Sequence, residues 1–405
     1  MKPIPGNKIF DALKDTNTIV MATNIRMMNG VALGVFKAAK EMDAAVIIEL
    51  AKSECDLKGG YTGLTPELLG KKSKEAAKKA GHDIWALHAD HTTIKKGDEE
   101  ELNSIRKLFD AHISAGYTSF AIDASFTFDV NAPTVEKALK TNIESTTKMY
   151  NYLREKMKGK EFGIEVEVGE IGYHDGRGNV KTSPEEAVAF IKGLKANGVE
   201  PDLLAIANGS AHGNNYDADG NLIPQLSIDV KQTIKVVEAL KKAGFDVKIA
   251  QHGITGTPRE FIKTHFPKKA ILKGNVGTFW QNLVWDVLKE NESDLFNEIT
   301  EWTLNSFRKE AENKGIKKDD QIFGLYSKKA NGQFFDKLYN LKKSTVDAME
   351  SKAFGEAEKF FDAFNAQGSA EIVRKNLRRK PLKKYKKPGK NIKKPKKNTE
   401  KIIRN

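Results

Sequence analysis

Short apolar runs alternate with longer amphipathic segments through most of this 405-residue chain. Runs rich in β-branched residues predict strands at 18–22, 45–50, 84–88, 118–122, 162–167, 202–206, 246–251 and 270–273. Apolar residues three and four apart predict helices at 30–41, 65–80, 98–115, 132–158, 183–197, 227–243 and 258–264. This alternation predicts a parallel sheet covered by helices. Eight such units favour a closed (β/α)8 TIM barrel, with an open doubly wound sheet as the alternative.

Two further helical segments follow the eighth predicted strand, at 281–313 and 340–366. Their apolar positions predict packing against the barrel or against a second subunit. The pattern ends at Gly368, and the remaining residues combine proline, glycine and lysine with too little apolar area to offset the entropy of ordering. The sequence therefore predicts three parts, which are a barrel at 1–280, a helical extension at 281–370 and a disordered Lys-rich tail at 371–405.

The basic charge of the chain is concentrated in this tail. Residues 371–405 hold 16 Lys or Arg and two acids, which gives +14, whereas the whole chain has a net charge of +13. Residues 1–370 are therefore close to neutral, which argues against a nucleic-acid-binding body. The tail would attract RNA or another anionic surface weakly and without sequence specificity, by counterion release. A solvated extension without a partner is the alternative.

The cellular compartment is indicated by what the sequence lacks. Cys55 is the only cysteine, which excludes an intrachain disulfide and is typical of a reducing cytoplasm. No apolar run approaches the roughly 20 residues that span a bilayer. The first residues, MKPIPGNKIF, lack the apolar core of a signal peptide. We therefore expect a cytoplasmic protein without a transmembrane segment.

Polar residues of the kinds that bind metals and substrates follow seven of the eight predicted strands. In a (β/α)8 barrel the carboxyl ends of the strands form the active site, so these residues are expected to converge. The third, sixth and seventh strands lead to His91, His212 and His252. Three neutral imidazoles with an open position are a typical catalytic zinc site. The other strand ends carry Asn24, Asp90, Asp123, Glu167, Lys273 and Asn275.

Several short motifs at these strand ends resemble those of the class II, zinc-dependent fructose-bisphosphate and tagatose-bisphosphate aldolases. They occur in the order and at the spacing of that family, and the resemblance covers about residues 8–366. The resembling segments are 87–91 (LHxDH in the family), 121–125 (MIDxS), 164–172 (VEAELGxxGG), 211–213 (AHG), 252–253 (the start of HGGSG) and 273–278 (KxNxDTD).

The resemblance implies an aldolase that reversibly cleaves a ketose bisphosphate, in the first instance fructose 1,6-bisphosphate, to dihydroxyacetone phosphate and glyceraldehyde 3-phosphate. Zinc would stabilise the enediolate, so no Schiff-base lysine is required. The zinc ligands would be His91, His212 and His252, with Asp123 and Glu167 at the place of a second divalent or monovalent cation. Asp90 would transfer the proton of the C4 hydroxyl. Substrate binding is expected at Asn24, Gly213, Gly253, Thr255, Asn275 and Thr278.

The chain departs from the family at several positions that concern the substrate. Asp175 aligns with the glutamate that exchanges a proton at carbon, but it is one methylene shorter, and His174 is a rival. In the phosphate-binding loops, Ile254 replaces a glycine, and Gly277 and Phe279 replace acids. Tagatose 1,6-bisphosphate or another ketose phosphate therefore stays open as the substrate.

Two other classes of function are weighed against the aldolase. A degenerate barrel could serve as a binding or scaffold protein through its tail, although a scaffold has no need of a carboxylate such as Asp90 beside the metal. An amidohydrolase-type barrel would need an HxH pair on the first strand, where this chain has residues 22–24, ATN. The resemblance also implies a homodimer or a higher homo-oligomer.

Overall fold

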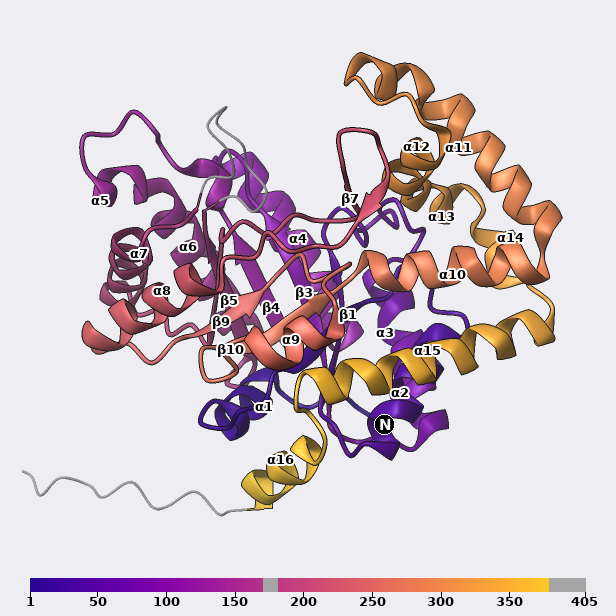
Figure 1. The fold of residues 1–405 in the computed structure, drawn as a ribbon. Helices are drawn as coiled ribbons and strands as arrows, with labels where there is room; N and C mark the ends of the chain where they lie inside the picture. Colours follow the sequence, from indigo (N-terminus) through magenta and orange to yellow (C-terminus); the bar gives the residue numbers. More distant parts are fainter. Residues whose placement is uncertain (170–180, 379–405) are drawn as a thin grey trace, which may run out of the picture.

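The computed structural model describes residues 1–169 and 181–378 of the chain. Eight parallel strands close into a barrel in the order β1-β10-β9-β6-β5-β4-β3-β2, and helices surround it (Figure 1). The predicted (β/α)8 barrel is confirmed, and the alternative of an open sheet is wrong because β1 pairs with both β2 and β10. The strands are β1 (Val20–Asn24), β2 (Val46–Ala51), β3 (Trp85–Thr93), β4 (Ser119–Asp123), β5 (Gly163–Val168), β6 (Leu203–Ile206), β9 (Lys248–Gln251) and β10 (Ile271–Val276).

Several of the helices that cover the barrel begin where a polar side chain caps the first turn. Thr65 and Asp98 accept from backbone N–H groups of the helices that follow them, and Ser183 forms a capping box with Glu186. The predicted helix at 132–158 is divided at Leu139 into two helices. The covering helices are α2 (Val31–Glu41), α3 (Pro66–Ala80), α4 (Glu99–Ala115), α5 (Val135–Ala138), α6 (Lys140–Met157), α7 (Pro184–Ala196), α8 (Val230–Lys242) and α9 (Arg259–His265).

The barrel interior changes from apolar to charged along the strands. Near the amino ends, Val20, Ala22 and Ile47 belong to a buried apolar cluster. Side chains alternate between the two faces of a strand, so residues two apart share the interior. On the same inward faces, nearer the carboxyl ends, lie Asn24, Glu49, His88, Asp90, Glu165 and Lys273, all buried. The apolar half therefore fills the bottom of the barrel, and the polar half leads to its mouth.

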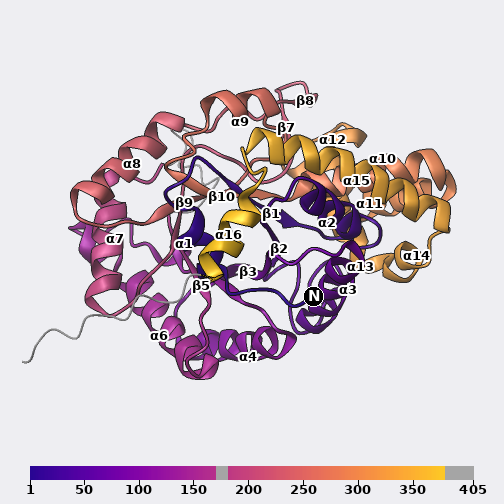
Figure 2. The same cartoon turned by 90° about the horizontal axis from the view of Figure 1, so that it is seen from below.

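Two helices close the bottom of the barrel, α1 (Gly6–Leu13) and α16 (Ser369–Arg378), which lie across the centre of the ring in Figure 2. Ala370 and Val373 of α16 are fully buried in the apolar cluster of the strand ends. The disordered tail expected from residue 371 is therefore wrong for residues 371–378, because Ala370 and Val373 pack with α1 in the apolar cluster at the bottom of the barrel. Residues 379–405, with the RNA contact expected of them, lie outside the described residues.

The helical extension follows β10 and packs along one side of the barrel (Figure 1). Its longest contact is that of α15 with α2, and a short two-stranded hairpin, β7 (Asn215–Tyr216) with β8 (Leu222–Ile223), lies near α12. Among the described residues, no helix is both long and apolar enough to cross a membrane. The extension consists of α10 (Thr278–Asn291), α11 (Ser293–Asn313), α12 (Asp319–Tyr326), η2 (Ser327–Lys329), α13 (Ala330–Gln333), α14 (Phe335–Tyr339) and α15 (Lys343–Ala363).

Candidate metal centre and active site

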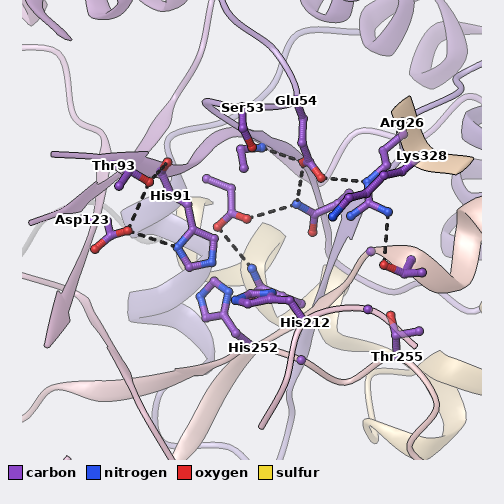
Figure 3. A pocket seen from close by; sticks show the side chains of 18 of the residues that line it. Arg26, Ser53, Glu54, His91, Thr93, Asp123, His212, His252, Thr255 and Lys328 are labelled. Carbon is purple, nitrogen blue, oxygen red and sulfur yellow. Dashed lines mark hydrogen bonds and ion pairs between the residues drawn. The ribbon is translucent and has the colours of Figure 1, made fainter. Parts of the chain in front are cut away.

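A single pocket at the mouth of the barrel collects every site residue that the sequence predicts within the described ranges (Figure 3). Asp175 and its rival His174 lie outside the described residues. The predicted residues that line the pocket are Asn24, Asp90, His91, Asp123, Glu167, His212, Gly213, His252, Gly253, Thr255, Asn275 and Thr278.

Three imidazole rings meet on one side of this pocket. The ring centres of His91 and His252 are 4.2 Å apart, those of His91 and His212 are 5.2 Å apart, and those of His212 and His252 are 5.9 Å apart. Each ring offers one nitrogen, and these nitrogens all lie within 4.8 Å of one another. Histidines from three separate strand ends of the sequence thus form one compact donor set.

A bulge in β3 directs His91 into the mouth. The pairing of β3 with β4 shifts register between Ala89 and Thr92, and His91 has a φ of 34°, in the left-handed region that few residues other than glycine adopt. Bulges of this kind re-aim a side chain and occur often beside active sites. Local backbone strain of this order is retained where the surrounding structure enforces it, and it concentrates at functional sites.

The carboxylates beside His91 and His252 each contact one nitrogen of the ring. His91 Nδ1 lies 2.9 Å from Glu167 Oε2, and His91 Nε2 is buried with no hydrogen-bond partner in the described part of the chain. His252 Nε2 lies 2.9 Å from Glu165 Oε1. A carboxylate that accepts from one ring nitrogen fixes the tautomer and leaves the other nitrogen's lone pair for a metal. The donor set therefore fits a zinc ion.

The protonation of the rings agrees with a metal site. Burial, together with the neighbouring His91, lowers the pKa of His212 to about 3 and also lowers that of His252. Both imidazoles are thus neutral near pH 7, as metal binding requires. Burial opposes the charged form of His91, but Glu167 and Asp90 outweigh it and raise its pKa well above the usual range. A bound cation could take the place of that proton.

Two carboxylates extend the donor set on the far side of His91. Asp123 Oδ2 lies 3.7 Å from His91 Nδ1, and Ser125 donates both its N–H and its Oγ–H to Asp123 Oδ1. Burial and the nearby charge of Asp123 raise the pKa of Glu167 to about 8. Two buried carboxylates that face one imidazole are also a set of oxygen and nitrogen donors that can hold a cation.

Asp90 lies between the histidines and the rest of the pocket. Asn24 Nδ2 donates to its Oδ2 (3.1 Å), Asn275 Nδ2 donates to its Oδ1 (3.2 Å), and Lys273 Nζ lies 3.5 Å from Oδ1. Burial alone would raise the pKa of Asp90, but the charges of His91 and Lys273 bring it well below the usual range. Asp90 is therefore an ionised carboxylate held in place by two amides, beside the three histidines.

Glu165 and Lys273 are buried charged residues to which the sequence analysis gave no role, although it placed Lys273 at a strand end. Lys273 Nζ is fully buried, 2.8 Å from Glu165 Oε2 and 2.9 Å from Glu49 Oε2. Glu165 in turn binds His252, so this lysine fixes the carboxylate that orients the His252 ring. Side chains alternate between the two faces of a strand, so Glu165 and Glu167 of β5 share the inward face. This alternation could have identified Glu165 from the sequence.

The loops predicted to bind phosphate have the expected backbone but altered side chains. Gly213 and Gly253 have φ values of 96° and 67°, which allow the sharp turns at the mouth. Ile254 lines the pocket but is fully buried and belongs to the apolar core. Thr255 Oγ1 accepts from the N–H of Phe279 and thereby ties this loop to the first turn of α10.

Cationic side chains of the opposite wall were not predicted. Arg26 follows β1, and its Nε donates to Glu54 Oε1 at 2.8 Å. Lys328 comes from η2 of the extension, and both side chains lie across the pocket from His91 and Asp123 (Figure 3). Arg26 stands two residues beyond a strand end and could have been found there, whereas nothing in the sequence links Lys328 to the barrel mouth.

Comparison with known proteins agrees with this geometry. Residues 5–329 match the family described as fructose-bisphosphate aldolase class-II. A search of curated proteins found no match. Among solved structures, the fructose-bisphosphate aldolase of Campylobacter jejuni superposes with a TM-score of 0.59 at 19% identity, covering 91% of this chain and 97% of the other.

Two further solved structures have the same fold at similarly low identity. The YdjI aldolase of Escherichia coli K12 has a TM-score of 0.56 at 18% identity and covers 91% of this chain and 99% of its own. A putative fructose-1,6-bisphosphate aldolase of Coccidioides immitis has a TM-score of 0.56 at 19% identity, with coverages of 91% and 98%. The match to the family covers most of the chain, so the protein belongs to the class II fructose-bisphosphate aldolases and is an aldolase of the ketose-phosphate type.

Proposed function

We propose that this aldolase is zinc-dependent and cleaves fructose 1,6-bisphosphate reversibly to dihydroxyacetone phosphate and glyceraldehyde 3-phosphate. The observation that carries the proposal is the convergence of His91, His212 and His252 beside the ionised carboxylate of Asp90. A divalent metal and an adjacent base are the two groups that a retro-aldol cleavage without a Schiff base requires.

The metal ligands are assigned from their free nitrogens. His91, His212 and His252 would hold zinc, and Asp123 with Glu167 would hold a second divalent or monovalent cation. Bound zinc supplies a Lewis acid that stabilises the enediolate charge. Glu165 keeps His252 in the tautomer that can bind, since it lies 2.9 Å from Nε2.

Asp90 is the proposed base for the C4 hydroxyl. In cleavage it takes the hydroxyl proton, and in condensation it returns it. The amide groups of Asn24 and Asn275 keep both of its oxygens in place, and they would lie beside the substrate hydroxyls. The proton at carbon would be exchanged by Asp175, as the resemblance implies.

The phosphate ends are proposed to bind at the turns of Gly213 and Gly253 and at Thr255 and Thr278. Backbone N–H groups in such turns and at a helix N-terminus bind anions. Tagatose 1,6-bisphosphate, which differs at C4, is the second candidate substrate, because the altered loops leave the sugar selectivity open. We also propose a homodimer or higher homo-oligomer in the cytoplasm, carried over from the family resemblance and the single cysteine.

A panel of substrates tests the proposal. The zinc-loaded protein is mixed in turn with fructose 1,6-bisphosphate, tagatose 1,6-bisphosphate and unphosphorylated fructose, and triose phosphate release is followed with a coupled dehydrogenase. We expect turnover of the fructose bisphosphate and none of fructose. Faster turnover of the tagatose bisphosphate would reassign the substrate. No turnover of either bisphosphate, with zinc shown to be bound, would favour the scaffold alternative.

A further inference from the structure

A groove lies within the helical extension, between α11 on one side and α13 with α14 on the other (Figure 1). Its volume is about 550 Å³, and it is lined by the rings of Trp302, Phe334 and Phe335 and by the carboxylates of Glu301 and Asp336. Trp302 packs edge-to-face on Phe334, with the ring centres 5.9 Å apart. Trp302 and Phe335 are only half-buried, so this α11–α14 groove exposes aromatic surface between charged groups.

The floor of the α11–α14 groove is fixed by the loop that follows β2. A Cβ at Gly63 would lie 2.5 Å from a ring carbon of Phe335, so this ring packs directly on the backbone of the loop. The N–H of Gly332 donates to the carbonyl oxygen of Tyr61 at 2.9 Å. The groove is therefore formed before anything binds in it, which lowers the entropic cost of binding.

Several carboxylates of the groove are not balanced by a neighbouring cation. Glu298 is paired with Lys337, but the side chains of Glu301 and Asp336 form no ion pair or hydrogen bond within residues 1–169 and 181–378. An adjacent hollow, which shares Glu298, Asp336 and Lys337 with the groove, adds Asp294, whose carboxylate has no cationic partner in the same ranges. The groove and this hollow therefore carry a net negative charge.

One lysine of the extension shows how this surface binds an ammonium group. Lys337 Nζ lies 2.6 Å from both carboxylate oxygens of Glu298 and 5.7 Å from the ring centre of Phe334. The face of an aromatic ring attracts a cation, and a nearby carboxylate neutralises its charge. The half-buried rings of Trp302 and Phe335 lie in the same groove as the two unpaired carboxylates and offer the same combination to a further lysine.

Residues 379–405 have the complementary composition. These 27 residues hold 13 Lys or Arg and one acid, Glu400, and they follow directly on Arg378, the last residue of α16. Tyr385 is the single aromatic residue among them, and two lysines stand on each side of it. A fully extended segment of this length spans about 90 Å, whereas a body of this size has a radius of gyration of about 21 Å. The segment is therefore long enough to reach the groove.

We propose that the α11–α14 groove is the docking site of the chain's own lysine-rich segment, with residues 383–387 against Trp302 and the unpaired carboxylates. The tyrosine ring would pack on the exposed aromatic surface, and the lysines on either side would pair with the acids. The hollow beside the β7–β8 hairpin is a poorer match, because its two acids are already paired with Lys352 and Arg259.

A single added cysteine makes the docking measurable in the full chain. Cys55, the only native cysteine, is buried, and burial raises the pKa of its thiol to about 12, so it should not react with thiol reagents. Gly389→Cys, two residues beyond the proposed contact, is therefore labelled selectively with a fluorophore that tryptophan quenches on contact. Trp302 is the one tryptophan among the described residues that is not buried, so quenching reports on the groove.

Variants of the labelled chain separate the groove from unspecific attraction. Trp302→Phe should abolish the quenching. Glu301→Gln with Asp336→Asn keeps the tryptophan but should lower the docked population roughly three- to tenfold, the effect of two exposed ion pairs. Glu312→Gln with Asp320→Asn makes the same change of charge outside the groove and should stay quenched. Raising the ionic strength from about 0.1 to about 1 M shortens the Debye length from about 10 to about 3 Å and should also relieve quenching.

Equal quenching in the groove variant and in its matched control would overturn the inference, and so would wild-type fluorescence that responds neither to salt nor to Trp302→Phe. A mixture of labelled chains that carry Trp302→Phe with unlabelled wild type tests whether the segment docks on its own chain. We expect no quenching in the mixture, because quenching there would place the segment on a second copy. Unchanged melting temperatures should show that the variants fold, and none of these results depends on which substrate is cleaved.

Discussion

Asp90 is the residue on which the proposed chemistry depends most. Its carboxylate accepts from Asn24 and Asn275 and lies next to the ligand His91. Asp90→Asn keeps the size of the side chain but removes the base, so kcat should fall by about a hundred- to ten-thousandfold. Stopped assays of triose phosphate release measure the change. Zinc content should be unchanged, and a variant that loses its zinc as well would mean that Asp90 only positions His91.

Ionisation of Asp202, at the amino end of β6, should make the stability of the fold depend on pH. Burial raises the pKa of this carboxyl from 3.8 to about 7 in the fold, although the N–H of Ile164 donates to its Oδ2 at 2.7 Å. The folded state therefore binds its proton more tightly than the unfolded chain. The stability that this proton contributes is fully present below pH 3.8 and is lost as pH rises towards 7.

Asp202→Asn removes this ionisation and keeps an acceptor for Ile164. The variant should therefore gain stability over the wild type as pH rises from 3.8 to about 7, the window set by the pKa of Asp202 in the unfolded chain and in the fold. Melting temperatures at both pH values measure it. A difference between variant and wild type that does not change with pH would contradict the raised pKa.

At the scale of elements, the contact of α2 with α15 depends on a glycine. A Cβ at Gly34 would lie 2.3 Å from the backbone oxygen of Glu350, so α15 can approach this closely only where a side chain is absent. Gly34→Ala should destabilise the protein by about 1–3 kcal/mol, as overpacking does. Gly355 on α15 is the matched control, because a Cβ there meets nothing within 4 Å.

The control should change stability in the opposite direction. Gly355→Ala reduces the freedom of the unfolded chain and improves helix propensity, so we expect a gain of about 0.5–1 kcal/mol. Chemical denaturation of both variants gives the comparison. If Gly34→Ala and Gly355→Ala change the free energy of unfolding in the same direction and by the same amount, Gly34 is not needed for the close packing of α2 against α15.

Local pattern and turn chemistry were enough to predict the elements of the barrel. Each predicted strand overlaps an observed one, because short buried apolar runs that alternate with capped helices have few alternatives. The bulge that turns His91 was not predictable, because it depends on how β3 pairs with β4. Helix α16 was missed because its apolar positions, Ala370 and Val373, have meaning only against the bottom of a closed barrel.

The candidate site was predictable only as far as it lies on strand ends. His91, His212 and His252 converge because parallel strands share one carboxyl edge, which the topology guarantees. Lys328 lies beyond the barrel, and only the path of the extension brings it back to the mouth. A residue that reaches the site in this way cannot be recognised from the residues next to it in the sequence.

At the scale of the whole molecule, the contacts of α16 indicate how far the C-terminus can be shortened without loss of stability. Ending the chain after Arg378 leaves every contact described above intact, so the melting temperature and the aldolase activity should be kept. Ending it after Gly368 removes Val373 from the bottom of the barrel and breaks the ion pairs of Arg374 with Asp43 (2.7 Å) and Asp83 (2.8 Å).

The shorter chain should therefore be less stable. The loss should be about 2 kcal/mol or more, mainly from the buried valine. Thermal unfolding of the two truncations provides the comparison. Equal melting temperatures would mean that α16 does not close the barrel, and loss of activity in the longer one would give residues 379–405 a role in catalysis.

Metal-dependent turnover is the most direct measurement of the central claim. The purified protein is assayed for cleavage of fructose 1,6-bisphosphate as isolated, after removal of metal with a chelator, and after zinc is returned, with the bound zinc quantified each time. We predict activity that disappears with the metal and returns with about one zinc per chain, the stoichiometry of a three-histidine site with an open position. Cleavage that persists in the metal-free protein would contradict the account, because nothing else described at the barrel mouth would then explain how the enediolate is stabilised.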